Sequence, residues 1–115
     1  MDIVERTFEF AGSIVKLADE VGQNSASARI PATQMLRSGT SIGANVEEAQ
    51  AAESKADFVH KYNIALKEAR ETHYWLRLLA ASNKVSSEDL PSLTRESDEI
   101  CRIIAQIIIN ARRGQ

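Results

Sequence analysis

The stretch that decides the fold is Ser54–Ser82, which reads SKADFVHKYNIALKEARETHYWLRLLAAS. Apolar and small residues recur in it at alternating spacings of four and three, which is the period of one face of an α-helix. These positions are Phe58, Tyr62, Ala65, Ala69, Thr72, Leu76 and Leu79. Ser54 to Asp57 resembles a capping box at the start, and Asn83 suits a left-handed cap at the end. The pattern predicts a long helix with one seam for antiparallel packing.

Two segments ahead of this helix also have helical patterning. The first expected helix spans Asp2–Val21, and its apolar residues cover about half of the circumference, which is more than one packing face needs. Gly22 follows it as a C-cap. The second expected helix starts near Pro31, a residue suited to a first helical turn, and continues to about Ala52.

The last part of the chain predicts a fourth helix. Its start signal is Ser86-Ser87-Glu88-Asp89, and Pro91 lies within a turn of that signal, which leaves open a separate short first turn. Apolar and small residues then repeat by four and three at Leu93, Ser97, Ile100, Ile104, Ile107 and Ala111. The cations Arg112 and Arg113 near the end of the chain suit a helix C-terminus.

The composition fits a wholly helical domain. The 115 residues are enough for one domain, and 43% hydrophobic with 26% charged residues is typical of a soluble globular chain. Two prolines and five glycines argue against a strand-and-turn architecture. We therefore predict an all-α fold, an antiparallel up-down-up-down four-helix bundle over residues 1–115. Because the first and fourth helices are apolar over too wide an arc for one interior, we also expect homo-oligomerisation.

Charge and cysteine content exclude several classes of protein. Fourteen Lys and Arg residues against sixteen Asp and Glu residues give a net charge of −2, unlike the strongly basic balance of many nucleic-acid binders. A single cysteine, Cys101, excludes an internal disulfide framework. The acidic start of the chain does not resemble a signal peptide, and no apolar run approaches the ~20 residues that span a bilayer. We expect a cytoplasmic protein with no membrane partner.

The expected second helix contains an unusual pair of glycines, Gly39 and Gly43. Each glycine inside a helix costs about 1 kcal/mol relative to alanine, so something must offset that cost. Close approach of a neighbouring backbone is the simplest candidate. We predict a close-contact strip, either within the bundle or between subunits, that Arg37, Asn45 and Glu48 anchor by hydrogen bonds.

The residues around these glycines carry a resemblance to a known family. The family pattern is roughly Arg-Ser, then Ser-Ile-x-Ala/Ser-Asn-Ile-Ala-Glu-Gly, then Ser-x-x-Asp-Phe. The matching positions are Arg37-Ser38, Ser41-Ile42, Ala44-Asn45-Val46, Glu48, Ser54, Asp57-Phe58, Ile64-Ala65, Glu71-Thr72 and Trp75-Leu76. On these motifs the chain resembles the four-helix-bundle proteins first noticed as products of reading frames in 23S rRNA intervening sequences. The resemblance covers about residues 2–111.

This resemblance implies a bacterial, cytoplasmic bundle that assembles as a ring-like homopentamer and has no established enzymatic activity or cofactor. A related branch comprises basic accessory proteins of diversity-generating retroelements, which bind nucleic acid and work with a reverse transcriptase. We therefore expect a non-enzymatic assembly or interaction protein. The alternative is a nucleic-acid-binding accessory protein that acts on RNA or DNA.

The family-motif residues are the candidates for an interface. They are Arg37, Ser38, Ser41, Asn45, Glu48, Asp57 and Phe58. The first five share one stripe of the expected second helix or lie beside it. Since an unpaired buried polar group costs about 1–3 kcal/mol, we expect them to satisfy polar groups at a helix or subunit interface. Contact with a ligand is the alternative.

Catalytic and metal sites find little support in the sequence. A di-iron bundle uses two Glu-x-x-His pairs, whereas here only Asp57-x-x-His60 approximates one pair. Cys101 lies beside an apolar helix face, where an inert thiol is usual, and His60 and His73 are expected at the surface or an interface. We predict no catalytic residue, no metal and no cofactor.

Nucleic-acid binding has one basis in the sequence, which is a run of cations on the Ser54–Ser82 helix. The candidate contacts are Lys55, Lys61, Lys67 and Arg70. Asp57, Glu68 and Glu71 interleave with them, so the simpler interpretation is a solvated face of mixed charge. Any binding by one chain is expected to be weak and salt-dependent, although a ring would multiply a modest site.

Overall fold

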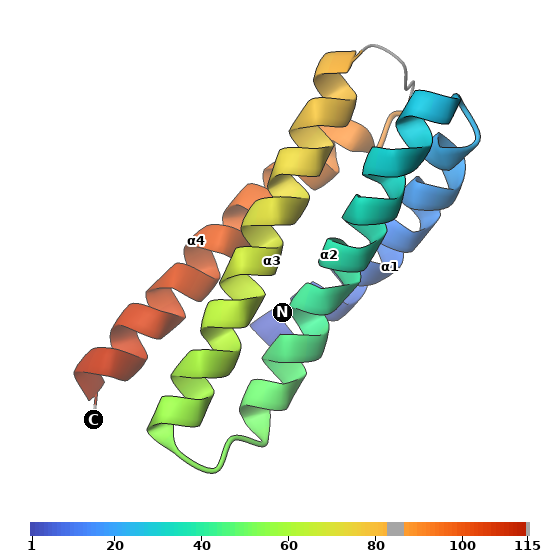
Figure 1. The fold of residues 1–115 in the computed structure, drawn as a ribbon. Helices are drawn as coiled ribbons and strands as arrows, with labels where there is room; N and C mark the ends of the chain where they lie inside the picture. The colour runs from blue at the N-terminus through green and yellow to red at the C-terminus, as the bar shows by residue number, and fades with distance from the viewer. Residues whose placement is uncertain (83–86, 115) are drawn as a thin grey trace.

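Four α-helices make up the computed structural model, which describes residues 1–82 and 87–114. They are α1 (Ile3–Gly22), α2 (Ala26–Gln50), α3 (Lys55–Ser82) and α4 (Leu90–Gly114). Successive helices run in opposite directions, and α2 lies between α1 and α3 (Figure 1). No strand occurs in the described residues. The predicted all-α four-helix bundle is therefore confirmed.

Side-chain caps fix where the first two helices begin. Asp2 accepts a hydrogen bond from the Glu5 amide (2.9 Å), and Ser25 accepts one from the Ala28 amide (3.1 Å). The prediction that the second helix starts near Pro31 is wrong, because α2 begins at Ala26. Serine is a strong N-cap, and a proline in the second turn removes only one intrahelical hydrogen bond.

The other helix ends agree closely with the sequence. Gly22 is the last residue of α1, so the C-cap falls one residue later than expected. The Ser54 hydroxyl caps α3 by accepting from the Asp57 amide at 3.0 Å. Pro91 lies in the first turn of α4, and the described residues 87–89 ahead of that helix form no separate short piece. The expected cap at Asn83 and the first residue of the Ser86 start signal lie outside the described residues.

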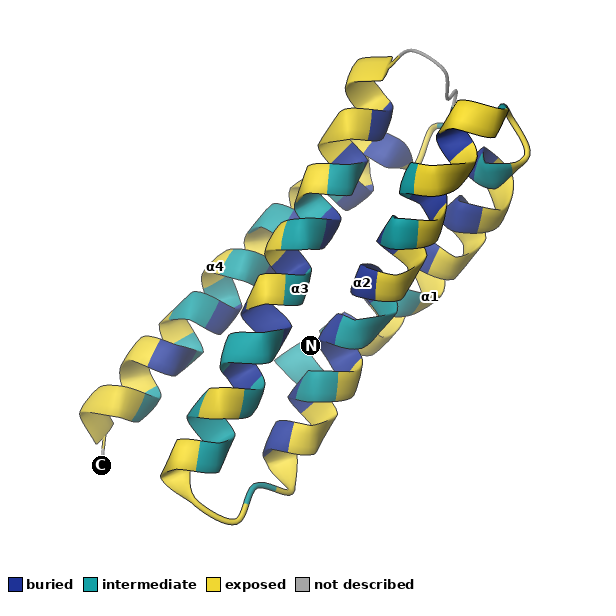
Figure 2. Ribbon diagram, in the orientation of Figure 1, coloured by how far each residue is buried: buried dark blue, intermediate teal, exposed yellow. Residues whose placement is uncertain are grey.

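The core lies along the predicted seam of α3 (Figure 2). Six of its seven positions are buried, and Phe58 is half-buried at the end near the α2–α3 turn. On α4, the buried residue after Ile104 is Ile108, whereas the predicted seam positions Ile107 and Ala111 are half-buried. At 20 residues, α1 is shorter than the other helices, and α2, α3 and α4 continue past its N-terminus (Figure 1).

A cluster of ion pairs joins α1 to α4. The Arg6 guanidinium lies 2.7 Å from a carboxylate oxygen of Glu96 and 2.8 Å from one of Glu99. Hydrogen bonds to these two carboxylates raise the pKa of Arg6 above its ordinary value. The cluster therefore ties the first helix of the chain to the last.

No helix in the described part of the chain is long and apolar enough to cross a membrane.

Candidate functional site

The two glycines of α2 lie where α1 approaches most closely. A Cβ atom added at Gly39 would stand 2.8 Å from Cγ2 of Ile14, and one added at Gly43 would stand 3.3 Å from the Thr7 carbonyl group. Thr7 is fully buried there, and its hydroxyl donates to the Ile3 carbonyl at 2.8 Å. The predicted close-contact strip is confirmed, and the contact lies within the bundle.

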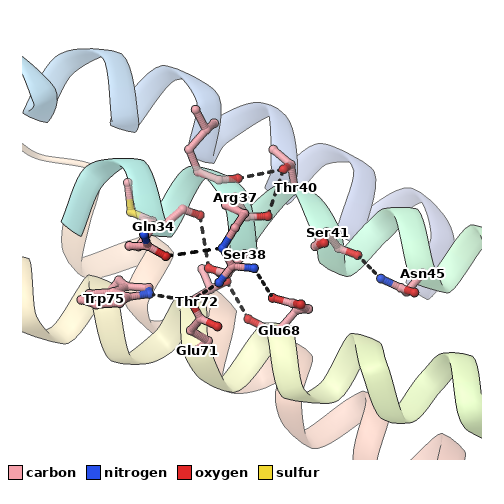
Figure 3. Close-up of polar contacts among 12 residues, drawn as sticks. Gln34, Arg37, Ser38, Thr40, Ser41, Asn45, Glu68, Glu71, Thr72 and Trp75 are labelled. Atoms are coloured by element: carbon pink, nitrogen blue, oxygen red, sulfur yellow. Dashed lines mark hydrogen bonds and ion pairs between the residues drawn. The ribbon is translucent and has the colours of Figure 1, made fainter. Parts of the chain in front are cut away.

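A buried pair of hydroxyl groups joins α2 to α3. Thr72 Oγ1 donates to Ser38 Oγ at 2.8 Å, and Ser38 in turn lies 3.4 Å from the Met35 carbonyl oxygen (Figure 3). Thr72 Oγ1 also lies 2.8 Å from the Glu68 carbonyl oxygen. Both side chains are fully buried, and every buried side-chain polar atom in the described residues has a hydrogen-bond partner. Ser38 thus supplies an interhelical hydrogen bond.

Arg37 lies at the centre of a polar cluster on the outer face between α2 and α3 (Figure 3). Its guanidinium pairs with Glu71 and lies 3.3 Å from Glu68. The indole nitrogen of Trp75 donates to Glu71 at 2.9 Å. Hydrogen bonds from Arg37 and Trp75 lower the pKa of Glu71, so this carboxyl stays ionised. The arginine therefore joins α2 to α3 of one chain through partly exposed ion pairs.

The polar residues of the motif do not anchor the glycine strip as predicted. Arg37 points toward α3, and Asn45 donates to the Ser41 carbonyl of its own helix at 2.9 Å. Glu48 is exposed. A helix turns by roughly 100° per residue, so these positions face away from the side on which Gly39 and Gly43 meet α1. The strip is held by apolar and backbone packing instead.

The remaining motif residues shape the turn between α2 and α3. The ring of Phe58 packs on that of Tyr62, with centroids 4.8 Å apart. Gln50, at the end of α2, donates to the Tyr62 hydroxyl at 3.0 Å. Asp57 lies half-buried in the first turn of α3, where its amide is capped by Ser54. The motif therefore combines helix-packing and turn-forming residues.

No group of three or more His, Cys, Asp or Glu side chains in the described part of the chain could hold a metal ion. One contact that sequence reasoning missed joins α3 to α4, where His73 Nδ1 lies 2.9 Å from Ser97 Oγ. Ser97 is fully buried, and its hydroxyl also donates to the Thr94 carbonyl at 2.8 Å, so it does not face a substrate. Burial raises the pKa of the Cys101 thiol, which disfavours the reactive thiolate.

The four cations proposed to contact nucleic acid do not share one face. Lys55 donates from Nζ to the Arg112 carbonyl at 3.2 Å, at the C-terminal end of α4. Lys67 and Arg70 are exposed and three residues apart, so they are neighbours on α3. Lys61 is half-buried and lies six residues before Lys67, which places it on a different side of the helix. The structure therefore brings two of these four cations together.

Exposed apolar side chains gather in two regions of the described part of the bundle, one on α1 and one between α2 and α3. The α1 patch consists of Phe8, which is 69% exposed, Val15, which is 46% exposed, and Val4, which is half-buried and also packs against the core. The α2–α3 groove is a hollow of about 450 Å³. Its residues are Ser27, Ala28, Ile30, Pro31, Trp75, Leu78, Leu79 and Ser82. Periodicity alone did not reveal the groove, because Ile30 and Leu78 lie on neighbouring helices 48 positions apart.

Comparisons with known proteins place this bundle in a family. The chain is similar to a crystal structure of a protein of unknown function from the S23 ribosomal protein family of Bacteroides thetaiotaomicron. The two share 44% sequence identity and a TM-score of 0.84, over 93% of this chain and 98% of that chain. No curated protein matches the chain. The family model for 23S rRNA-intervening sequence proteins matches residues 1–106, and neither comparison indicates an enzymatic family. The chain therefore belongs to the family of 23S rRNA-intervening sequence proteins.

Proposed function

We propose that this chain is the subunit of a homo-oligomer that acts as a non-enzymatic assembly or interaction protein in the cytoplasm. The observation that carries the proposal is the exposure of large apolar side chains in two groups, the α1 patch and the α2–α3 groove. Five subunits in a ring are what the resemblance of the motif residues leads us to expect.

The size of the exposed side chains supports this proposal. Burial of one Phe or Leu side chain stabilises a protein by about 1.5–3 kcal/mol. Phe8 and Ile30 are each 69% exposed, so most of that stabilisation is unused at these two residues in a single chain, and Leu78, at 41% exposed, leaves a smaller part unused. Scattered apolar residues on a surface need no explanation, whereas contiguous ones mark interaction sites. Burial between copies would recover this free energy.

Nucleic-acid binding has weaker support from the structure. The chain carries a net charge of −2, and only Lys67 and Arg70 of the four candidate cations are exposed neighbours. Glu68 lies between these cations in the sequence and Glu71 directly follows Arg70, and both glutamates pair with Arg37. Protein association therefore ranks ahead of binding to RNA or DNA, which would rest on release of counterions from phosphates.

Native mass spectrometry of the purified protein tests the proposal. We expect a single species with five times the 12.7 kDa mass of the chain, and the same mass after nuclease treatment. A species that loses mass or dissociates after nuclease treatment would favour the nucleic-acid alternative. A monomer at micromolar concentration would overturn the proposal. An assembly of another subunit number would keep the homo-oligomer and correct the ring size.

A further inference from the structure

We propose that the α1 patch of one copy packs into the α2–α3 groove of the next copy, so that the subunit interface is heterologous. This inference rests on the proposed homo-oligomer and names the surfaces that build it. A heterologous contact uses two different surfaces of each subunit and generates a ring when the rotation between copies closes.

The α1 patch has the features of the inserting partner. Phe8 projects from the side of α1 that borders α2, and it is the most exposed aromatic residue described. Val4 and Val15 lie four residues before and seven residues after it, so all three fall on one stripe of the helix. Together they form a ridge of apolar side chains along a single helix.

The α2–α3 groove has the features of the receiving partner. Ile30 and Pro31 form one wall on α2, and Trp75 and Leu78 form the other on α3. Its volume of about 450 Å³ is large enough for an aromatic ring with its neighbours, and its lining is almost entirely apolar. Helix α2 lies between α1 and α3 (Figure 1). The patch residues belong to α1 and the groove residues to α2 and α3, so one subunit carries both surfaces.

The charges around the two surfaces favour pairing of unlike surfaces. Helix α1 carries four acidic and two basic residues, and Glu5, Glu9 and Glu47 line the hollow beside Phe8. Helix α3 carries five basic and three acidic residues. Patch-to-patch contact between two copies would bring these carboxylates together, and like charges across an interface are unfavourable. Patch-to-groove contact brings the acidic helix of one copy near the basic helix of the next.

A complementation experiment with two variants tests this pairing. Phe8→Asp removes the patch and leaves the groove intact, and Leu78→Asp does the reverse. Both side chains are exposed, so we expect both variants to keep the helical circular dichroism spectrum of the wild type. We expect each variant alone to be monomeric in native mass spectrometry. An equimolar mixture is expected to give a dimer with one copy of each variant, because one intact patch and one intact groove remain available.

Ile109→Asp is the matched control. Ile109 is 43% exposed on α4 and belongs to neither surface, so this variant is expected to keep the wild-type mass. The pairing is overturned if Leu78→Asp keeps the wild-type mass, if Phe8→Asp does so, or if the mixture stays monomeric at the concentration where the wild type is fully assembled. A monomeric wild type would instead overturn the proposed oligomer itself, which separates the two failures.

Discussion

Helix α2 meets α1 and α3 through faces of different chemistry. Toward α1 it presents Gly39 and Gly43, and the helices approach until a single added carbon would meet Ile14 or the Thr7 backbone. Toward α3 it presents Ser38, whose hydroxyl pairs with Thr72, and Arg37, whose guanidinium reaches two carboxylates. The first face depends on shape and the second on hydrogen bonds and charge.

The comparison shows how one short motif serves several contacts. Arg37, Ser38 and Gly39 are consecutive, and rotation by roughly 100° per residue directs them to the outer face between α2 and α3, to α3 and to α1 respectively. A substitution at each of these positions is therefore expected to destabilise the fold for a different physical reason. Overpacking, a lost buried hydrogen bond and a lost exposed ion pair differ in their energetic cost, which makes the two faces separable by experiment.

The largest effect is expected on the glycine face. Gly39→Leu and Gly43→Leu should each destabilise the fold by about 1–3 kcal/mol, since a Cβ atom at Gly39 would clash with Ile14 and one at Gly43 would already be tight against Thr7 before the rest of the leucine is added. Gly22→Leu is the control, because a Cβ atom at Gly22 meets nothing within 4 Å. Thermal melting followed by circular dichroism measures the difference. Equal melting temperatures for all three variants would contradict the close contact between α1 and α2.

An intermediate effect is expected at the buried hydroxyl pair. Thr72→Val removes the hydrogen bond between Ser38 and α3, whereas the Ser38 hydroxyl keeps its contact with the Met35 carbonyl oxygen, so the free energy of unfolding should fall by about 0.5–1.5 kcal/mol. The double variant Ser38→Ala with Thr72→Val removes both groups, so its loss should be smaller than the sum of the two single losses. Urea unfolding of the four proteins gives the interaction energy. Strict additivity would mean that the two hydroxyls do not stabilise each other.

The smallest effect is expected at the exposed ion cluster, and it should depend on pH. Arg37 lowers the pKa of Glu71 in the folded state, so the pair stabilises the fold above the ordinary glutamate pKa of 4.5. That stabilisation is lost as the pH falls through the lowered folded-state value. The melting temperature of wild type should therefore exceed that of Arg37→Gln at pH 7, and the gap should close in acid. Arg29→Gln, an exposed change elsewhere on α2, serves as the control and should show no such closing. A gap of constant size down to about pH 3 would exclude Glu71 as the titrating partner.

The fold was largely predictable from periodicity, and the polar contacts were not. The α3 seam and the close approach at the glycines follow from local spacing, because helical period and glycine cost are local properties. The partners of Arg37 are 31 and 34 residues away on another helix, and no local rule selects Glu68 and Glu71 over the other acids. The same holds for His73 and Ser97, which meet only because α3 packs on α4.

The single tryptophan of the chain occupies an informative position. Trp75 forms part of the α2–α3 groove, and its indole nitrogen is hydrogen-bonded to the carboxylate that pairs with Arg37. Its fluorescence therefore originates from one known location and senses both the polarity of the groove and the charge beside it. The molecule thus carries an intrinsic optical reporter for whatever comes to lie against that surface, without any label being attached.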